Sequence, residues 1–304
     1  LTSLLLTTRA PVVFAPAMHT EMWEHPATVA NVATLRSRGV IVIDPATGRL
    51  TGRDSGPGRL PEPASLMSVC EAVLDRGSAE ADLVGRHVVI SGGGTREALD
   101  PVRYLGNRSS GRQAWALASA AVARGATVHV IAANVSAPDP AGATVERVVS
   151  AAQMRDAVVA AAEPADVVVM AAAVADFRPV VVAPKKIKKD DSGGVPEPVA
   201  LARTVDILAE LGGRSGHPLL VGFAAETVGS AAELEQAATK KLRTKGADLV
   251  VANEVGDGVG FESGSNAVVI VGPEGVVRTV SLTSKEGIAN AVWDSVVARL
   301  TAGC

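Results

Sequence analysis

The sequence predicts an α/β fold built around a mostly parallel sheet. Apolar segments of strand length alternate with segments of helical periodicity along most of the 304 residues. Such alternation favours parallel strands joined by right-handed crossovers. The composition agrees, because Ala, Val and Gly dominate an apolar share of 47% while aromatic residues make up only 3%. Small and β-branched side chains are typical of strands buried on both faces.

The first part of the chain contains few expected elements. These are strands over residues 11–15 and 40–43 and helices over residues 27–38 and 64–75. Residues 44–63 are rich in Gly, Pro and charge, which predicts a loop. The polar segment 76–82 is expected to be a linker, so the predicted domains span residues 1–75 and 83–304.

The second domain continues the alternation of strand and helix. Strands are expected over residues 87–90, 127–132, 165–173, 219–224 and 247–252, and helices over residues 110–124, 151–162, 204–211 and 231–245. After them, P-E-G between the apolar runs 267–271 and 276–282 predicts a hairpin. A last helix is expected over residues 285–300, where T-S-K-E resembles a capping box.

Charge and cysteine usage narrow the class of protein. A formal net charge of −3 gives no sign of the basic face that nucleic-acid binding needs. Cys70 and Cys304 fit no metal spacing, nor do the five histidines, so we expect a reducing, cytoplasmic setting. No apolar run is long enough for an expected membrane span. Because the N-terminus lacks both Met and a signal sequence, we expect a fragment of a longer chain.

A glycine-rich segment, S-G-G-G-T, follows the first strand of the second domain and contains Gly92, Gly93 and Gly94. Glycines there allow a sharp turn and expose backbone N–H groups to an anion, although a plain tight turn would use the same residues. A dinucleotide fingerprint is disfavoured, because no G-x-x-G spacing follows and the next strand ends A-A-N at residues 132–134 without an acidic residue. We predict a substrate-binding loop.

The stretch L-D-P-V-R-Y-L-G-N-R-S-S-G, residues 99–111, precedes a predicted helix and is rich in polar groups. Its polar and cationic side chains are those of Arg103, Asn107, Arg108, Ser109 and Ser110, followed by Gly111. A helix N-terminus adds positive potential, so the stretch suits a phosphate or carboxylate substrate. An N-cap with a solvated loop would explain one serine, but not the whole set.

Charged groups also follow the strand expected over residues 165–173. Asp176 lies just past its carboxyl end, where open parallel sheets bind ligands; it could bind a nucleotide base or a magnesium ion, or cap a helix. Four lysines then crowd a short loop: Lys185, Lys186, Lys188 and Lys189. A charge run is usually a solvated face, but these lysines repel one another unless an anion binds, so we predict a triphosphate-binding flap.

The residues alone do not decide the role of two further groups. Phe223, in G-F-A-A-E-T at the end of a strand, could stack on a base or pack in the core. Late on the helix expected over residues 231–245 come the cations Lys240, Lys241, Arg243 and Lys245. They suit the C-terminal end of a helix dipole without any ligand.

Taken together, these segments resemble the phosphopantothenate–cysteine ligase half of a bacterial bifunctional family of coenzyme A biosynthesis. That family fuses the ligase to phosphopantothenoylcysteine decarboxylase. The matching segments are D-P-V-R-Y-L-G-N-R-S-S-G, A-A-V-A-D-F, A-P-K-K-I-K-K, G-F-A-A-E-T and A-N-E-V. The resemblance implies a Rossmann-like, doubly wound ligase domain that forms a homodimer, with the active site near the dimer interface.

The resemblance also implies a reaction. The carboxylate of 4′-phosphopantothenate attacks the α-phosphate of CTP with the help of Mg²⁺, giving an acyl-cytidylate and pyrophosphate. The amine of cysteine then attacks the acyl carbon, giving 4′-phosphopantothenoylcysteine and CMP. Asn107 and Lys186 take catalytic roles in this assignment, and Asp176 is the candidate metal ligand.

Binding roles follow from the same assignment. The phosphopantothenate side comprises Gly92, Gly93, Gly94, Arg103, Asn107, Ser109, Ser110 and Gly111. The nucleotide side comprises Ala171, Ala172, Ala173, Asp176, Lys186, Val205, Asp206, Ile207, Leu208, Phe223, Lys241 and Lys245.

Residues 1–75 resemble the tail of the flavodoxin-like, flavin-dependent decarboxylase, through P-A-M at residues 16–18, M-W-E-H-P-A after it and G-P-G-R at residues 56–59. His19 stands where the family has Asn, T-G-R-D at residues 51–54 lacks the family's catalytic cysteine, and the upstream half with most of the flavin site is missing. We therefore expect FMN and decarboxylation only in a full-length parent, whose decarboxylase halves build larger assemblies. The present chain should stop at a dimer.

Two other functions compete with the ligase. A short-chain-type nicotinamide oxidoreductase shares the doubly wound sheet, but it generally needs a Lys four residues after a Tyr. The one tyrosine, Tyr104, is followed at that spacing by Arg108. A non-catalytic module that senses a nucleotide would bind CTP without releasing pyrophosphate.

Overall fold

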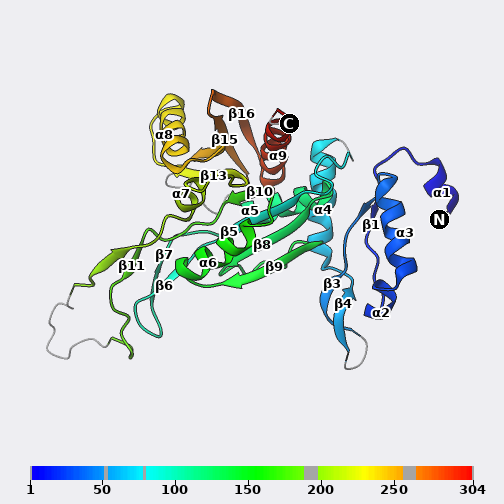
Figure 1. The fold of residues 1–304 in the computed structure, drawn as a ribbon, viewed down its shortest axis with the longest axis horizontal. Coiled ribbons are helices and arrows are strands. Elements are labelled where there is room, and N and C mark those ends of the chain that lie inside the picture. The colour runs from blue at the N-terminus through cyan, green and yellow to red at the C-terminus, as the bar shows by residue number, and fades with distance from the viewer. Residues whose placement is uncertain (1, 51–53, 78–79, 188–197, 256–264, 303–304) are drawn as a thin grey trace.

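A computed structural model describes residues 2–50, 54–77, 80–187, 198–255 and 265–302, and its centre is an eight-stranded sheet (Figure 1). The strand order is β16 (Gly275–Ser284), β15 (Ser265–Gly272), β14 (Leu249–Glu254), β13 (Leu219–Glu226), β10 (Val167–Met170), β5 (His87–Gly93), β8 (Thr127–Ala133) and β9 (Ala143–Val148). All neighbours from β14 to β9 run parallel, while β15 and β16 are antiparallel. The predicted mostly parallel α/β sheet and its terminal hairpin are confirmed.

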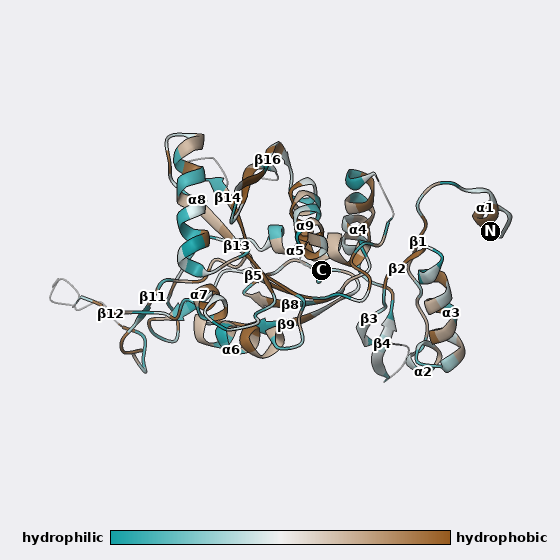
Figure 2. Ribbon diagram, turned by 45° about the horizontal axis from the view of Figure 1, so that its top comes forward, coloured by the Kyte–Doolittle hydropathy of each residue, from teal (hydrophilic) through white to brown (hydrophobic). Residues whose placement is uncertain are grey.

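Helices cover both faces of this sheet. The first face carries α4 (Pro63–Arg76), α5 (Arg112–Ala123) and α9 (Lys285–Ala302), and the second carries α6 (Ala151–Ala162), α7 (Ile207–Gly212) and α8 (Ala231–Lys245). Because successive strand residues point to opposite faces, Val167 and Val169 of β10 join the first core while Val168 joins the second. Figure 2 shows hydrophobic residues along the central strands and many hydrophilic ones along α8. The fold is doubly wound.

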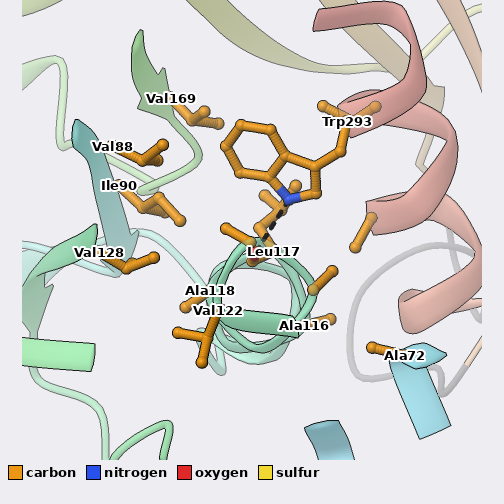
Figure 3. Packing of buried hydrophobic residues seen from close by; sticks show 14 of the residues in the cluster. Ala72, Val88, Ile90, Ala116, Leu117, Ala118, Val122, Val128, Val169 and Trp293 are labelled. Atoms are coloured by element: carbon orange, nitrogen blue, oxygen red, sulfur yellow. Dashed lines mark hydrogen bonds between the residues drawn. The ribbon is translucent and has the colours of Figure 1, made fainter. Parts of the chain in front are cut away.

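The largest fully buried side chain of the described residues is that of Trp293 on α9, which fills the first core (Figure 3). Its ring lies between α5 and the strand residues Val169 and Ile90. Its indole Nε1 donates a hydrogen bond of 2.9 Å to the carbonyl of Leu117. A buried Trp needs such a partner, because an unpaired indole N–H would offset part of the gain from burying the ring.

Several short strands were not expected from the sequence. Residues 44–63 are not all loop, because β3 (Ala46–Arg49) and β4 (Ser55–Arg59) form an antiparallel pair there. The edge strand β9 was missed because its A-T-V-E-R-V sequence is polar, as edge strands often are. Two further pairs, β6 (Arg96–Ala98) with β7 (Tyr104–Gly106) and β11 (Phe177–Pro179) with β12 (Leu201–Arg203), extend away from the sheet. We call residues 96–106 together with 177–187 and 198–203 the arm (Figure 1).

Two helices begin two or three residues later than expected, and the cap of a third differs from the expected one. Helix α5 begins at Arg112 rather than residue 110, because Gly111 has a left-handed φ of 77°. Helix α7 begins at Ile207 rather than residue 204, since Asp206 is its N-cap and accepts from the N–H of Ala209. At α9 the cap is formed by Ser284, which accepts from Gly287, so the expected Thr–Glu capping box is wrong.

The N-terminal part contains β1 (Val13–Phe14) paired in parallel with β2 (Ile41–Val42), and the helices α1 (Thr2–Thr7), α2 (Thr20–Trp23) and α3 (Pro26–Ser37). Helix α4 lies between this part and α5 and α9 in Figures 1 and 2. Val69, Ala72 and Val73 of α4 belong to the first core, and Asn290 of α9 donates to the Ala72 carbonyl. Thus α4, expected in the N-terminal domain, packs as part of the second. No helix of the described part of the chain is long and apolar enough to cross a membrane.

Candidate functional site

A cleft of about 520 Å³ opens at the carboxyl ends of β10 and β13. Its walls come from β10 and the segment after it, from the turn between β12 and α7, from β13 and from the last turns of α8. The lining residues are Met170, Ala172, Val174, Ala175, Asp176, Phe177, Arg203, Thr204, Val205, Asp206, Ile207, Leu208, Phe223, Lys241 and Lys245. This is the edge at which open parallel sheets bind ligands.

Most of the predicted nucleotide-binding residues lie together in this cleft. Those that line it are Ala172, Asp176, Val205, Asp206, Ile207, Leu208, Phe223, Lys241 and Lys245. Ala173 instead pairs with the glycine segment, because its N–H donates to Gly93 and its carbonyl accepts from Thr95. Ala171 packs against the first core, and Lys186 is exposed on the arm. Phe223, Lys241 and Lys245, whose roles the residues alone left open, therefore face the same cavity, whereas Lys240 and Arg243 do not line it.

Cations and one acid meet on the α7–α8 side of the cleft. Lys245 forms an ion pair with Asp206, whose other carboxylate oxygen accepts from Ala209 at 3.0 Å. Burial favours a higher pKa for Asp206, but the hydrogen bond from Lys245 and the charges of Lys245 and Lys241 outweigh it, so the pKa lies below its ordinary value. The side-chain ammonium of Lys241 makes no hydrogen bond or ion pair with the described residues, so it is available to an anion.

Asp176 lies at the rim of the same cleft, and its exposed carboxylate has no hydrogen bond or ion pair with any described residue. Its backbone is fixed, because its carbonyl accepts from Thr204 and the neighbouring Ala175 N–H donates to Thr95 Oγ1 at 2.8 Å. No group of three or more acidic, His or Cys side chains that could hold a metal occurs in the described ranges. A single carboxylate can hold Mg²⁺ only if phosphate oxygens and water molecules complete the octahedral coordination of the ion. Magnesium commonly binds in this way together with nucleotides.

The glycine segment brings β5 against its neighbours with no room for side chains. A Cβ on Gly93 would lie 2.0 Å from the Ala133 carbonyl oxygen, and one on Gly92 would lie 2.5 Å from the Ala114 Cβ. The N–H of Gly94 donates to Ala133 at 3.0 Å, so that group is not exposed to an anion as expected. Residue 94 is therefore also a glycine because neighbouring backbone approaches it closely, and not because its N–H group is free.

Asn107 connects the predicted substrate stretch to the cleft. Its side-chain Nδ2 donates 3.0 Å to the carbonyl of Val174, which lines the cavity. Ser109 Oγ accepts a long bond of 3.4 Å from Gly111, and no side chain caps the first N–H groups of α5. Those N–H groups remain available beside Ser110, at the positive end of the helix.

Arg103 is held within the arm rather than lying free for a substrate. Its Nε and Nη2 donate to Asp100 Oδ2 at 2.9 and 2.6 Å, and Nη2 also donates to the carbonyl of Ile187. Asp100 is buried and accepts from the Ile187 N–H as well. The Arg103 guanidinium holds the pKa of Asp100 well below its usual range.

This cluster fixes the base of the predicted lysine flap one residue after Lys186; Lys188 and Lys189 lie outside the described residues. The sequence reading missed Asp100. The D-P-V-R spacing at residues 100–103 indicates its role, because this spacing lets the Asp100 carboxylate accept hydrogen bonds from the N–H groups of Val102 and Arg103.

Comparison with protein-family models matches residues 83–300 to the DNA/pantothenate metabolism flavoprotein C-terminal domain and residues 1–75 to the flavoprotein family. The Coenzyme A biosynthesis bifunctional protein CoaBC of Mycobacterium tuberculosis is 50% identical over 312 residues, covering 100% of this chain and 74% of that protein. CoaBC of Bacillus subtilis is 43% identical over 300 residues, covering 98% of this chain and 72% of that protein.

Solved structures show the same relationship. The crystal structure of the C-terminal domain of a CoaBC protein superposes with a TM-score of 0.61 at 35% identity, covering 73% of this chain and 100% of that domain. A mutant of Cab2 in complex with phosphopantothenate-cysteine has a TM-score of 0.56 at 17% identity, covering 80% of this chain and 96% of that one. At that identity the second likeness concerns the fold alone.

Proposed function

Because the chain belongs to the CoaBC family of coenzyme A biosynthesis enzymes, we propose that it ligates 4′-phosphopantothenate to L-cysteine at the expense of CTP. The products are 4′-phosphopantothenoylcysteine, CMP and pyrophosphate. The observation that carries this proposal is the cleft at the ends of β10 and β13, where nine side chains or backbone positions assigned to the nucleotide converge. Phosphopantothenate-cysteine bound to a Cab2 mutant of the same fold supports the substrate class.

In the first half-reaction, a carboxylate oxygen of 4′-phosphopantothenate attacks the α-phosphorus of CTP. The bond from that phosphorus to the bridging oxygen breaks, and pyrophosphate leaves with the electron pair. Lys241 and Lys245 line the cleft, and we assign them to the phosphates; in the same assignment, Lys186 on the flap neutralises the charge that develops there. Bound Mg²⁺, held at Asp176, would supply further charge neutralisation on the phosphate oxygens.

In the second half-reaction, the cysteine amine attacks the acyl carbon of the acyl-cytidylate. The bond from the acyl carbon to the phosphate oxygen breaks, CMP leaves, and the amine loses one proton. Asn107 lies beside the cleft through its bond to the Val174 carbonyl, so we assign it to the acyl group. The apolar wall of Val205, Leu208 and Phe223 suits the cytosine ring and keeps water from this side of the intermediate.

We also propose a homodimer that forms through the arm. The arm carries exposed apolar side chains in the described residues, among them Val102, Tyr104, Phe177, Val180, Val181, Val182 and Leu201. Exposed apolar side chains that gather on one part of a protein are typical of a protein interface. The arm begins at the glycine segment and ends at the cleft, so a second copy seated there would lie next to the active site.

The direct test is pyrophosphate release from CTP with Mg²⁺ and 4′-phosphopantothenate, with and without cysteine. We expect release that requires phosphopantothenate, followed by CMP once cysteine is added. CTP binding without pyrophosphate release would instead identify a nucleotide-sensing module.

Two variants test the assigned site residues. Asn107→Asp should accumulate little product, because a carboxylate repels the acyl-phosphate, and Lys186→Gln should prevent formation of the acyl-cytidylate. Each effect is expected to be about 100-fold or larger in kcat, measured as pyrophosphate burst and as product by mass spectrometry. Full turnover in both variants would refute the assignment of these two residues.

A further inference from the structure

We propose that α4 is a positioning element of the ligase site, because it fixes the loop 135–142, whose first residues brace the glycine segment and the start of α5. This inference rests on the proposed function, since it takes Gly92–Gly94 and Ser109–Gly111 as the phosphopantothenate side of the site. It goes further by giving α4, which lies within the flavoprotein match, a role in the ligation reaction.

Two consecutive carbonyls of the loop 135–142 are held by two different helices. Ser65 Oγ of α4 donates 2.6 Å to the carbonyl of Asp139, and Trp115 Nε1 of α5 donates 2.6 Å to the carbonyl of Pro138. Arg147 of β9 adds bonds to the Asp139 carboxylate at 2.6 Å and to the Val135 carbonyl at 3.3 Å. Ser65 is only 6% exposed, so its hydroxyl is committed to this contact.

Asn134, the residue directly before the loop, contacts the glycine segment. Among the described residues, Asn134 is the one non-glycine with a positive φ, at 54°. Its side-chain Nδ2 donates to the carbonyls of Gly94 at 2.8 Å and Val149 at 3.1 Å. A strained backbone persists only where the surroundings determine it, and here the two bonds made by the side chain provide that determination.

Val135 extends this brace to the start of α5. Its Cγ2 would lie 2.6 Å from a Cβ on Gly93 and 2.7 Å from a Cβ on Gly111. One valine side chain therefore fills the space against both glycines. A shift of the loop would move Val135 away from the Gly93 turn and from the N-terminus of α5 together, because packed interiors transmit small displacements.

Helix α4 is firmly attached at its other contacts, so it can serve as the fixed end of this network. Val69 and Ala72 are almost fully buried against the first core, and Ser284 donates to Asp75 at 3.0 Å. At the end of the helix, Arg76 pairs with Asp82, and Asp82 pairs with the buried Arg124, the C-cap residue of α5. None of these contacts in the described structure involves a residue that lines the nucleotide cleft. The affinity of the cleft for CTP should therefore not depend on α4.

The test uses the full chain with Ser65→Ala and Asn134→Gly, and Ser68→Ala as matched control. Ser68 lies one turn further along α4, and its hydroxyl bonds only within the helix, to Ala64. We expect KM for phosphopantothenate to rise about three- to tenfold in the first two variants, as loss of one positioning hydrogen bond implies. KM for CTP should stay within about twofold of the parent value. Ser65→Thr, which keeps the hydroxyl, should restore the parent KM.

Hydrogen–deuterium exchange provides a readout that needs no turnover. Backbone amides of residues 91–95 and 109–115 should exchange faster in Ser65→Ala and Asn134→Gly than in the parent, and at the parent rate in Ser68→Ala. Equal exchange and equal KM in Ser65→Ala and Ser68→Ala would overturn the proposal, as would equal rises in KM for both substrates. If the parent chain releases no pyrophosphate, the proposed ligase function fails, while the exchange data still decide whether α4 positions the loop.

Discussion

The ion pair between Lys245 and Asp206 orders a cation at the cleft before any nucleotide binds. Asp206 is fixed because it also caps α7 through Ala209. Lys245 is thereby held in one orientation, while the ammonium of Lys241, one turn earlier on α8, has no hydrogen bond or ion pair with a described residue. Both lysines would stabilise a bound triphosphate, but binding would cost less side-chain entropy at Lys245, which is already ordered.

This arrangement predicts different roles for neighbouring lysines of α8. Lys241→Ala and Lys245→Ala should each raise KM for CTP by about tenfold or more, since each removes a charge-assisted contact to phosphate. Lys240→Ala is the matched control, because Lys240 is on the same helix but does not line the cleft. Steady-state kinetics at fixed phosphopantothenate and cysteine measure the effect. A similar KM in all three variants would exclude α8 from the phosphate site.

Asp206 also predicts a pH dependence of stability. Its pKa is lower in the folded chain than in the unfolded one, so its contribution is present above its ordinary pKa, about 3.9, and is lost as pH falls through the folded value. Asp206→Asn keeps a capping oxygen but removes the charge. We expect this variant to melt below the parent at pH 7 and the difference to close below about pH 4. A difference that stays constant between pH 7 and pH 3 would contradict the assignment to the charged pair.

At the scale of elements, the contact between α5 and α9 is the main support of the first face of the sheet. Trp293 fills the space between these helices and is fully buried (Figure 3). Trp293→Ala should therefore lower the free energy of unfolding by about 3–5 kcal/mol through lost burial and the cavity left behind. Urea denaturation measures it, with Leu282→Ala as control, because Leu282 is 73% exposed. A loss no larger than that of the control would mean that the core repacks around the missing ring.

The elements that the sequence predicts well are those with long apolar runs. All five parallel strands expected in the second domain are present, and the hairpin of β15 and β16 follows from the turn residues between two such runs. The arm strands and β9 have three to six residues, and their sequences are mostly polar or contain glycine or proline. Their pairing is determined by tertiary contacts, which hydrophobic periodicity does not report.

Some residues of the candidate site could likewise be predicted from the sequence, and others could not. Asp176 was predicted from its position just past a strand end, Phe223, Lys241 and Lys245 were assigned by resemblance, and all four line one cleft. Asp100 and Asn134 were missed because their importance comes from partners far away in sequence. Asp100 anchors Arg103 and Ile187, and the side chain of Asn134 reaches back to Gly94. No single local pattern indicates such contacts.

At the scale of the whole molecule, several of the exposed apolar side chains lie on the arm. Val181 is 76% exposed and Leu201 is 49% exposed. Exposed β-branched and leucine side chains on short paired strands are costly in water. Pairing of two arms would bury them and place a second chain beside Asn107 and Lys186.

The exposed apolar side chains of the arm therefore lead to a prediction about the oligomeric state of the chain. We expect the chain to sediment as a dimer, and the pair of substitutions Val181→Asp and Leu201→Asp to raise the dimer Kd by about tenfold or more, because they bury charge at the interface. Turnover should fall with the dimer fraction. Leu282→Asp, on the edge strand β16, changes an equally exposed apolar side chain outside the arm and should leave the dimer intact. If the double variant remains a dimer and Leu282→Asp dissociates, the interface lies along the sheet edge, and the site is completed within one chain.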